Sequence, residues 1–216
     1  MARWAVFDVD GTLLPHTSTE QEFFKHLLAQ QMLPQANLGM FLLMSAWHTI
    51  RRQPHQLKAN KMYLRGFPVN ATRRYGKRFF HRFLWPRFSR DGIAEVLHRH
   101  AAGYRIFILS GAPLFLVEPL RQKLPVDELL ASQPEERNGR FTGWLAAPHP
   151  YAQQKRDYLL ELAAPLEIDF HQSVVFANHH TDALHMELFG EVVAVNPTPR
   201  LESEAHQNGW RIVHWH

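Results

Sequence analysis

The chain has no cysteine among its 216 residues. Disulfide bonds, thiolate metal sites and a cysteine nucleophile are therefore excluded. Long apolar runs are missing too, because no stretch reaches the roughly 18 apolar residues that a membrane-spanning helix needs. The early apolar run, Trp4 to Phe7, is short and is followed by Asp8 and Asp10, unlike a secretory signal peptide. We therefore expect a cytoplasmic protein.

Acidic residues are scarce in one part of the chain. Between His16 and Phe88 there are 12 Lys or Arg residues but only two acids, Glu20 and Glu22, which gives this segment a net charge of +10. The other residues carry a net charge of −6, so the total of +4 conceals two regions of opposite sign. Such a division predicts two structural units with different electrostatic roles.

Outside this segment, strand-like and helix-like patterns alternate. Helical patterns lie over residues 91–102, after Pro113 and from Tyr151 onward, and Asn138-Gly139 is a turn signal that predicts a β-ribbon over residues 136–146. Strands alternating with helices predict an α/β fold with a parallel sheet covered on both faces. Short β-prone runs occur at residues 4–7, 105–109, 126–130, 173–177, 192–195 and 210–214.

The basic segment has a helical pattern with breaks near Pro34, Pro54 and Pro68. Thr17, followed three places later by Glu20, is a capping-box pattern that predicts the start of the first helix.

Two stretches of the basic segment are open to more than one interpretation. The apolar run from Leu38 to Trp47 fits a helix of a hydrophobic core, or a surface that meets a membrane or a lipid tail. From Arg73 to Phe88, basic and aromatic residues interleave. This pattern is typical of nucleic-acid binding, of an amphipathic helix with a solvated basic face, and of a surface that draws anionic substrates toward a site.

Polar residues follow several predicted strands, where ligands gather in open α/β sheets. Asp8 can act as a nucleophile and Asp10 as a proton donor and acceptor, while Ser110 and Lys155 can hold phosphate oxygens. A magnesium ion fits between Asp8 and an oxygen of Asn178. The sequence therefore predicts a phosphate site at this edge of the sheet.

These residues resemble, in order, the four motifs of the haloacid dehalogenase-type phosphatases. The stretch from Glu135 to Gly143 and residues 194–210 resemble subfamily IB, which includes phosphoserine phosphatase-like enzymes and the bacterial phosphatidylglycerophosphate phosphatase type. The four motifs are Asp8-x-Asp10-Gly11-Thr12-Leu13, Ser110-Gly111-Ala112, Lys155 and Asn178-x-x-x-Asp182.

The resemblance implies a Rossmann-like core, residues 1–15 and 89–216, with a helical type-one cap, residues 16–88, inserted after the first strand. It implies a Mg²⁺-dependent phosphomonoesterase that forms an aspartyl phosphate. Asp182 would orient Lys155 or the metal shell. The implied roles are catalysis for Asp8 and Asp10, phosphate binding for Thr12, Ser110, Gly111 and Lys155, and metal binding for Asp8, Asp10 and Asn178.

Three positions depart from the family pattern. Asn178 stands where the family has an aspartate that binds magnesium, so metal affinity and activity should be lower. Gln154 replaces a glycine that often precedes the motif lysine. Thr17 stands where phosphoserine phosphatases have a glutamate at the start of the cap, which argues against phosphoserine as the substrate.

We therefore expect a small or lipid-like anionic phosphoester as the substrate. Two alternatives remain: a catalytically weak homologue that binds a phosphorylated ligand, and an adaptor whose basic cap binds nucleic acid or a membrane. Nucleic acid is the less favoured partner, and peripheral contact with the inner membrane face is compatible with the cytoplasmic location. The spacing of His180 and His185 does not favour zinc. His179 is open to two interpretations, a plain surface histidine, which is the favoured one, and a group that modulates the charge of the magnesium site.

Overall fold

The computed structural model describes every residue from Met1 to His216. Six strands form one sheet in the order β3-β2-β1-β6-β7-β8, and each neighbouring pair is parallel. All six predicted strands overlap an observed one, which confirms the expected parallel sheet. The strands are β1 (Trp4–Phe7), β2 (Arg105–Pro113), β3 (Glu128–Ser132), β6 (Val174–Ala177), β7 (Glu191–Val195) and β8 (Arg211–Val213).

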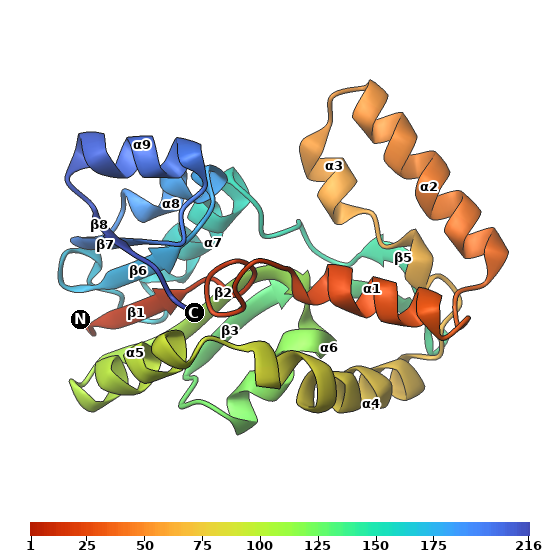
Figure 1. The fold of residues 1–216 in the computed structure, drawn as a ribbon, viewed down its shortest axis with the longest axis horizontal. Helices are drawn as coiled ribbons and strands as arrows, with labels where there is room; N and C mark the ends of the chain where they lie inside the picture. The colour runs from red at the N-terminus through yellow and green to blue at the C-terminus, as the bar shows by residue number, and fades with distance from the viewer.

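Alternate residues of each strand enter two separate hydrophobic layers, as the two-residue period of a strand requires. In β1, Ala5 and Phe7 join one buried cluster, while Trp4 and Val6 join the other. Helices cover both faces of the sheet (Figure 1). One face is covered by α7 (Gln153–Ala163), α8 (Ala183–Met186) and α9 (Pro199–Asn208), and the other by α5 (Arg90–Ala101) and α6 (Leu114–Val117).

Residues 16–88, which we call the helical segment, contain helices and no strand longer than an isolated bridge. The predicted breaks are confirmed, since α2 and α4 follow Pro34 and Pro68 and α3 begins at Pro54. The larger hydrophobic cluster continues from the sheet into this segment through residues such as Phe23 and Phe80. Its α-helices are α1 (Thr19–Ala29), α2 (Gln35–Ile50), α3 (Pro54–Ala59) and α4 (Val69–Phe79), followed by short helical turns up to Arg87.

The predicted β-ribbon is confirmed as β4 (Pro134–Arg137) paired antiparallel with β5 (Arg140–Leu145). Asn138 and Gly139 both have the positive φ angles that such a tight turn requires. The ribbon lies against the helical segment through a bridge between Pro68 and Arg140.

The predicted capping box is wrong at the start of α1. Ser18, not Thr17, is the N-cap, and its Oγ accepts a hydrogen bond from the backbone N–H of Gln21. Thr17 instead donates to Glu22. Glu20 is unavailable for capping because it accepts from Lys61 and Tyr63 inside the helical segment.

The interpretation of the apolar run as a core helix is also wrong. The run lies in α2, and none of the 16 residues of that helix is buried. Its position at the outer edge of the molecule explains the exposure (Figure 1). No helix in the structure has both the length and the apolar character needed to cross a bilayer.

Candidate functional site

The first strand places Asp8 at the carboxyl edge of the sheet. Phe7 pairs with Phe176 across β1 and β6, and their rings stack with centroids 4.4 Å apart. The backbone N–H of Asp8 continues this pairing by donating to the carbonyl of Phe176 at 3.0 Å. Because the strands are parallel and in register, the residues after them, Asp8 and Asn178, reach the same edge.

Gly11 lets the loop after Asp8 approach Asn178 closely. Its φ is +83°, a conformation that side chains other than glycine rarely adopt. A Cβ at this position would lie 2.1 Å from Nδ2 of Asn178, so a larger residue would collide with that side chain. The backbone of the loop and the Asn178 side chain are therefore in direct contact.

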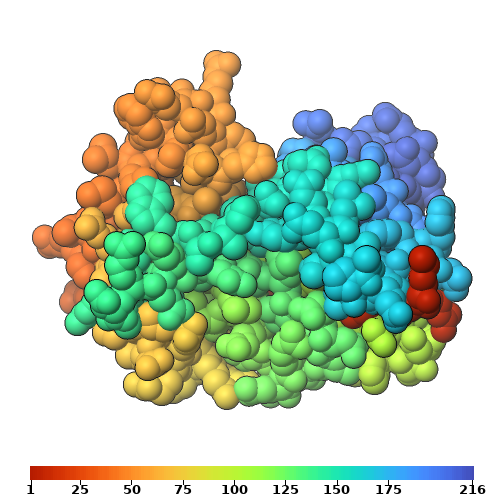
Figure 2. Space-filling model, turned by 180° about the vertical axis from the view of Figure 1, so that it is seen from behind, coloured from red at the N-terminus to blue at the C-terminus, as the bar shows by residue number.

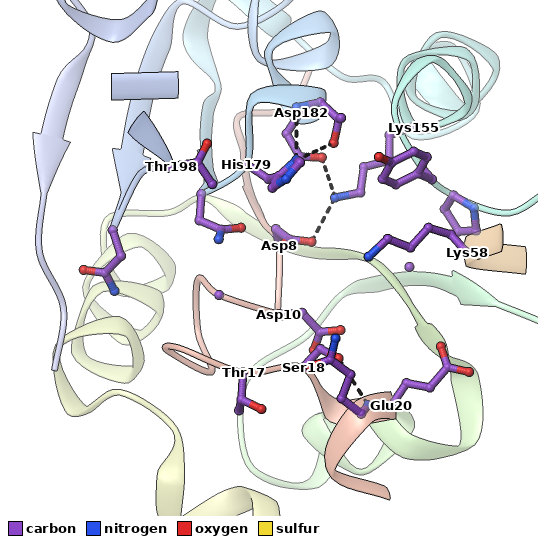
Figure 3. Close-up of a pocket in the computed structure, with 18 of the residues that line it drawn as sticks. Asp8, Asp10, Thr17, Ser18, Glu20, Lys58, Lys155, His179, Asp182 and Thr198 are labelled. Carbon is purple, nitrogen blue, oxygen red and sulfur yellow. Dashed lines mark hydrogen bonds and ion pairs between the residues drawn. The ribbon is translucent and has the colours of Figure 1, made fainter. Parts of the chain in front are cut away.

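A buried cation joins two of the predicted site residues. Nζ of Lys155 lies 2.8 Å from Oδ1 of Asp8 and 2.8 Å from Oδ1 of Asp182 (Figure 3). All three residues are almost completely buried. Lys155 reaches the strand ends because it lies in the first turn of α7.

This triad shifts the pKa of each of its members. Burial acts first to raise the pKa of Asp8, to about 6, and Lys155 opposes that rise. Burial also acts on Asp182, but the charge of Lys155 prevails and lowers the pKa of that carboxyl. Burial alone would lower the pKa of Lys155, yet the Asp182 and Asp8 carboxylates raise it above its usual range. Lys155 is therefore a permanent cation, and Asp8 is largely ionised at neutral pH.

Asp10 lies across the cavity from Lys155, where α1 begins (Figure 3). Its Oδ1 accepts a hydrogen bond from the backbone N–H of Thr19 at 2.9 Å. Burial raises the pKa of Asp10 to about 7, although that hydrogen bond opposes the rise. A carboxyl group with such a pKa can both donate and accept a proton near neutral pH.

Two of the predicted phosphate ligands are fully buried. Thr12 donates from Oγ1 to Oδ2 of Asp8 at 3.3 Å, and Oγ of Ser110 accepts from the backbone N–H of Ala112. Neither residue lines the cavity, whereas Gly111 does.

Asp8, Asp10, Gly111, Lys155, Asn178 and Asp182 line one cavity of about 550 Å³. The structure thus brings together most of the residues that the sequence predicts for the site. Only one of the 21 lining residues is hydrophobic.

The donors in this cavity fit a magnesium ion. Asp8, Asp10 and Asn178 all offer oxygen atoms, which Mg²⁺ prefers. Lys155, the only buried cation of the lining, pairs with Asp8 and Asp182 but not with Asp10, so negative charge is left over when all three carboxyl groups are ionised. A divalent cation would supply the missing charge.

The histidines beside Asp182 differ in their surroundings. Nδ1 of His179 is hydrogen-bonded to Oγ1 of Thr181 at 2.9 Å, and the His179 side chain lines the cavity. His185 is buried, and burial lowers its pKa to about 3. No group of three or more His, Asp or Glu side chains is arranged to hold a metal ion. Asn178, which the sequence predicts as a magnesium ligand beside Asp8 and Asp10, offers an amide oxygen instead of a carboxylate oxygen.

The structure adds site residues that no sequence motif predicts. From the helical segment, Lys58 and Glu20 line the cavity opposite Asp8 (Figure 3). Burial and the charges of Lys61 and Lys155 lower the pKa of His149, another lining residue, to about 2. Only the fold reveals these residues, because they belong to none of the four motifs.

The basic and aromatic stretch does not reach the cavity. Phe79, Phe80 and Phe88 are buried, Arg73 pairs with Glu136, and none of the stretch's basic residues lines the site. Lys58 is the one Lys or Arg of the helical segment that does. The structure thus favours a solvated basic face for this stretch.

Comparison with known proteins places the chain among hydrolases. A family model described as haloacid dehalogenase-like hydrolase matches residues 5–187. The chain is 24% identical to phosphoserine phosphatase SerB1 of Mycobacterium tuberculosis, over 96% of this chain and 69% of that protein. It is 21% identical to a histidinol-phosphatase of Neisseria meningitidis over the full length of both.

The fold also matches solved structures. A Bordetella pertussis protein of unknown function superposes with a TM-score of 0.85 at 21% identity, covering 99% of this chain and 98% of that one. The similarity confirms the α/β architecture expected from the sequence.

Proposed function

The chain belongs to the haloacid dehalogenase-like hydrolase family, and we propose that it is a magnesium-dependent phosphomonoesterase whose nucleophile is Asp8. The observation that carries the proposal is the position of Asp8. Its carboxylate is buried and paired with Lys155, and it faces a polar cavity that Asp10 also lines.

In the first step, a carboxylate oxygen of Asp8 attacks phosphorus and the phosphorus–oxygen bond to the alcohol breaks. Oδ2 suits this role, since its only side-chain partner is the hydroxyl of Thr12 at 3.3 Å. Asp10 gives its proton to the departing alkoxide, and its pKa of about 7 keeps a useful fraction protonated at neutral pH. Lys155 and the backbone around Gly111 hold the phosphate oxygens.

In the second step, water attacks the aspartyl phosphate and Asp10 takes the proton of that water. Inorganic phosphate leaves and the Asp8 carboxylate is restored. Asp182 keeps Lys155 oriented through its 2.8 Å contact. Magnesium, held by Asp8, Asp10 and Asn178, would offset the repulsion between the carboxylate and the phosphate. The helical segment acts as a cap on a core of residues 1–15 and 89–216, and supplies Glu20 and Lys58 to the cavity.

The cavity favours a small, polar phosphoester. Only one of its 21 lining residues is hydrophobic, and the others offer many hydrogen-bonding groups. A lipid-like phosphoester would have to keep its tails outside this cavity. Turnover should therefore be measured with and without Mg²⁺ on a panel of an aryl phosphate, phosphoserine, histidinol phosphate, a sugar phosphate and a short-chain phosphatidylglycerophosphate. If none of these compounds is hydrolysed in the presence of Mg²⁺, the proposal is refuted.

Asn178 favours a second candidate, a homologue that binds a phosphorylated ligand without turning it over. The amide offers oxygen but no charge, so metal binding is weaker than with a carboxylate. Tight, metal-independent binding of a phosphorylated compound without release of phosphate would support this candidate.

Asn178→Asp should tighten magnesium binding by about tenfold or more, which corresponds to about 1.4 kcal/mol. Two unit charges at about 4 Å interact by about 4 kcal/mol near a protein surface, and desolvation offsets part of this gain. Calorimetric titration with Mg²⁺ measures the effect directly, and turnover at low Mg²⁺ should rise in parallel.

Gln21→Glu is the matched control, because it adds the same charge to the side of the cavity formed by the helical segment. It should change magnesium affinity much less. Equal tightening in both variants would mean that Asn178 does not contact the metal.

A second prediction concerns the hydrogen-bond acceptor that His149 presents to the substrate. Ser132 has one hydroxyl proton and donates it to the carbonyl of Gly111 at 2.7 Å. Ser132 must therefore accept from Nδ1 of His149, which lies 2.6 Å away. Since the ring is neutral, Nε2 is an acceptor, and no protein group bonds to it. It lies beside Gly111 in the cavity and suits a hydroxyl or ammonium group of the substrate.

His149→Phe should raise KM about fivefold for a phosphoester with such a group, since a neutral hydrogen bond contributes about 1 kcal/mol. The KM for an aryl phosphate, which has no donor there, should stay unchanged. Equal losses on both substrates would show that His149 acts through the Gly111 loop instead.

A further inference from the structure

The outward face of α2 is apolar, the reverse of an ordinary surface helix. Ala36, Met40, Leu43, Trp47 and Ile50 follow one another at spacings of three or four residues and are all exposed. We call these five residues the outer stripe. Leu43 is 68% exposed, Trp47 52% and Ile50 79%. Isolated exposed apolar residues are common on protein surfaces, but a continuous stripe of this kind marks an interaction surface.

The opposite side of α2 is fixed to the rest of the helical segment. Phe41 packs on Phe24 and Tyr63, with ring centroids 5.1 and 5.7 Å away. Asn60 donates to the backbone carbonyl of Phe41 and to Oγ of Ser45. These contacts set the rotation of α2 about its axis, so the outer stripe is held facing away from the body.

The helix also projects beyond the rest of the chain. In Figure 1 it lies at the edge farthest from the sheet, and in Figure 2 the orange atoms of this region rise above the body of the molecule. A flat surface can therefore reach the outer stripe without meeting the core.

The charges around the outer stripe select its partner. Residues 23–88 contain no acidic residue, and α2 itself carries no Lys or Arg. Arg51 and Arg52 follow it directly, both are exposed and neither forms a salt bridge. The Arg51 guanidinium lies over the Trp47 ring, 4.2 Å from its centroid. An apolar stripe with Trp, on a helix without acidic residues that is followed by two arginines, is the pattern of a helix that lies in an anionic lipid surface.

A second copy of the chain is a poor occupant of the same face. Pairing two outer stripes would bring together two helical segments that each carry a net charge of +10. We therefore propose that α2 binds peripherally to a bilayer of anionic phospholipid, with the outer stripe among the upper acyl chains and Arg51 and Arg52 at the phosphates. The proposal does not depend on the phosphatase activity.

Vesicle co-sedimentation tests this proposal. The wild-type protein should bind vesicles made of equal parts phosphatidylcholine and phosphatidylglycerol, and binding should weaken as salt rises. Leu43→Ser with Trp47→Ser should reduce affinity by more than about tenfold, since it removes the apolar anchor. Arg51→Gln with Arg52→Gln should reduce vesicle affinity about 30-fold, because each positive charge at an anionic surface contributes about 1 kcal/mol.

The matched control is Leu97→Ser, which removes a leucine of similar exposure, 48%, from α5 of the core. It should leave vesicle binding unchanged, and thermal melts should show that every variant is folded. Absence of wild-type binding, or equal losses in the control and the outer-stripe variant, would overturn the proposal. The proposal would also be overturned if analytical ultracentrifugation showed a dimer that the Leu43 and Trp47 changes dissociate. Binding of the outer stripe to an acidic polypeptide in preference to vesicles would overturn it too.

Discussion

Asp8→Asn should lower phosphatase turnover by roughly 10³-fold or more, as expected when the nucleophile of a covalent mechanism is removed. The amide has nearly the shape of the carboxylate but is a far weaker nucleophile toward phosphorus. Lys155 keeps its second partner, Asp182, at 2.8 Å, so the cation stays paired and the site keeps its arrangement. Turnover of an aryl phosphate under saturating Mg²⁺ is the measurement.

Two controls separate a chemical loss from a structural one. Asp157→Asn makes the same change on α7, the helix that carries Lys155, at a residue outside the cavity, and should leave turnover intact. Unfolding curves should show that Asp8→Asn remains folded. Brief reaction with labelled substrate should leave acid-stable label on the wild-type chain but none on the variant. Full turnover by Asp8→Asn would show that another group attacks phosphorus.

The sheet and much of the site could be predicted because their determinants are local. Runs such as Val174 to Ala177 are short, apolar and bounded by polar residues, which indicates a buried strand. The strands are parallel, so Asp8 and Asn178 had to meet at one edge. No long-range packing detail was needed for either inference.

The His149 network could not be predicted, because it depends on how separate elements pack. Ser132 meets Gly111 because β3 and β2 are neighbours with a shift in register, which the sequence does not specify. His149 then reaches Ser132 from the loop before α7. The 16 residues between the two contain the β4–β5 ribbon.

The orientation of α2 was hidden for a different reason. Its sequence is apolar on nearly every side, so periodicity alone does not say which face packs against the rest of the protein. The hydrogen bonds from Asn60 and the packing of Phe41 decide the matter. Likewise, the choice of Ser18 over Thr17 as N-cap depends on Glu20 being held by Lys61, a contact across 41 residues.

Lys155→Met should abolish turnover. It should also destabilise the protein by roughly 3–5 kcal/mol at neutral pH, although it removes only one ammonium group. The cost arises because Asp8 and Asp182 would remain buried without their shared cation. For a chain of this size, the melting temperature should fall by roughly 10 °C. Lys25→Met is the matched control: Lys25 pairs with Glu22 but is 67% exposed, so its loss should cost at most about 1 kcal/mol.

The destabilisation should depend on pH in a definite direction. In the wild type, Lys155 lowers the pKa of Asp182, so this carboxyl stabilises the fold above its unfolded pKa and loses that contribution as the pH falls. Without the cation, burial would raise the pKa of both carboxyl groups in the folded state, and the variant would become less stable as the pH rises. The difference in unfolding free energy between wild type and Lys155→Met should therefore be largest near pH 8 and shrink toward pH 4. Urea unfolding at several pH values measures it. A difference that is independent of pH would mean that Lys155 stabilises the fold by packing, and that its contacts with Asp8 and Asp182 contribute little.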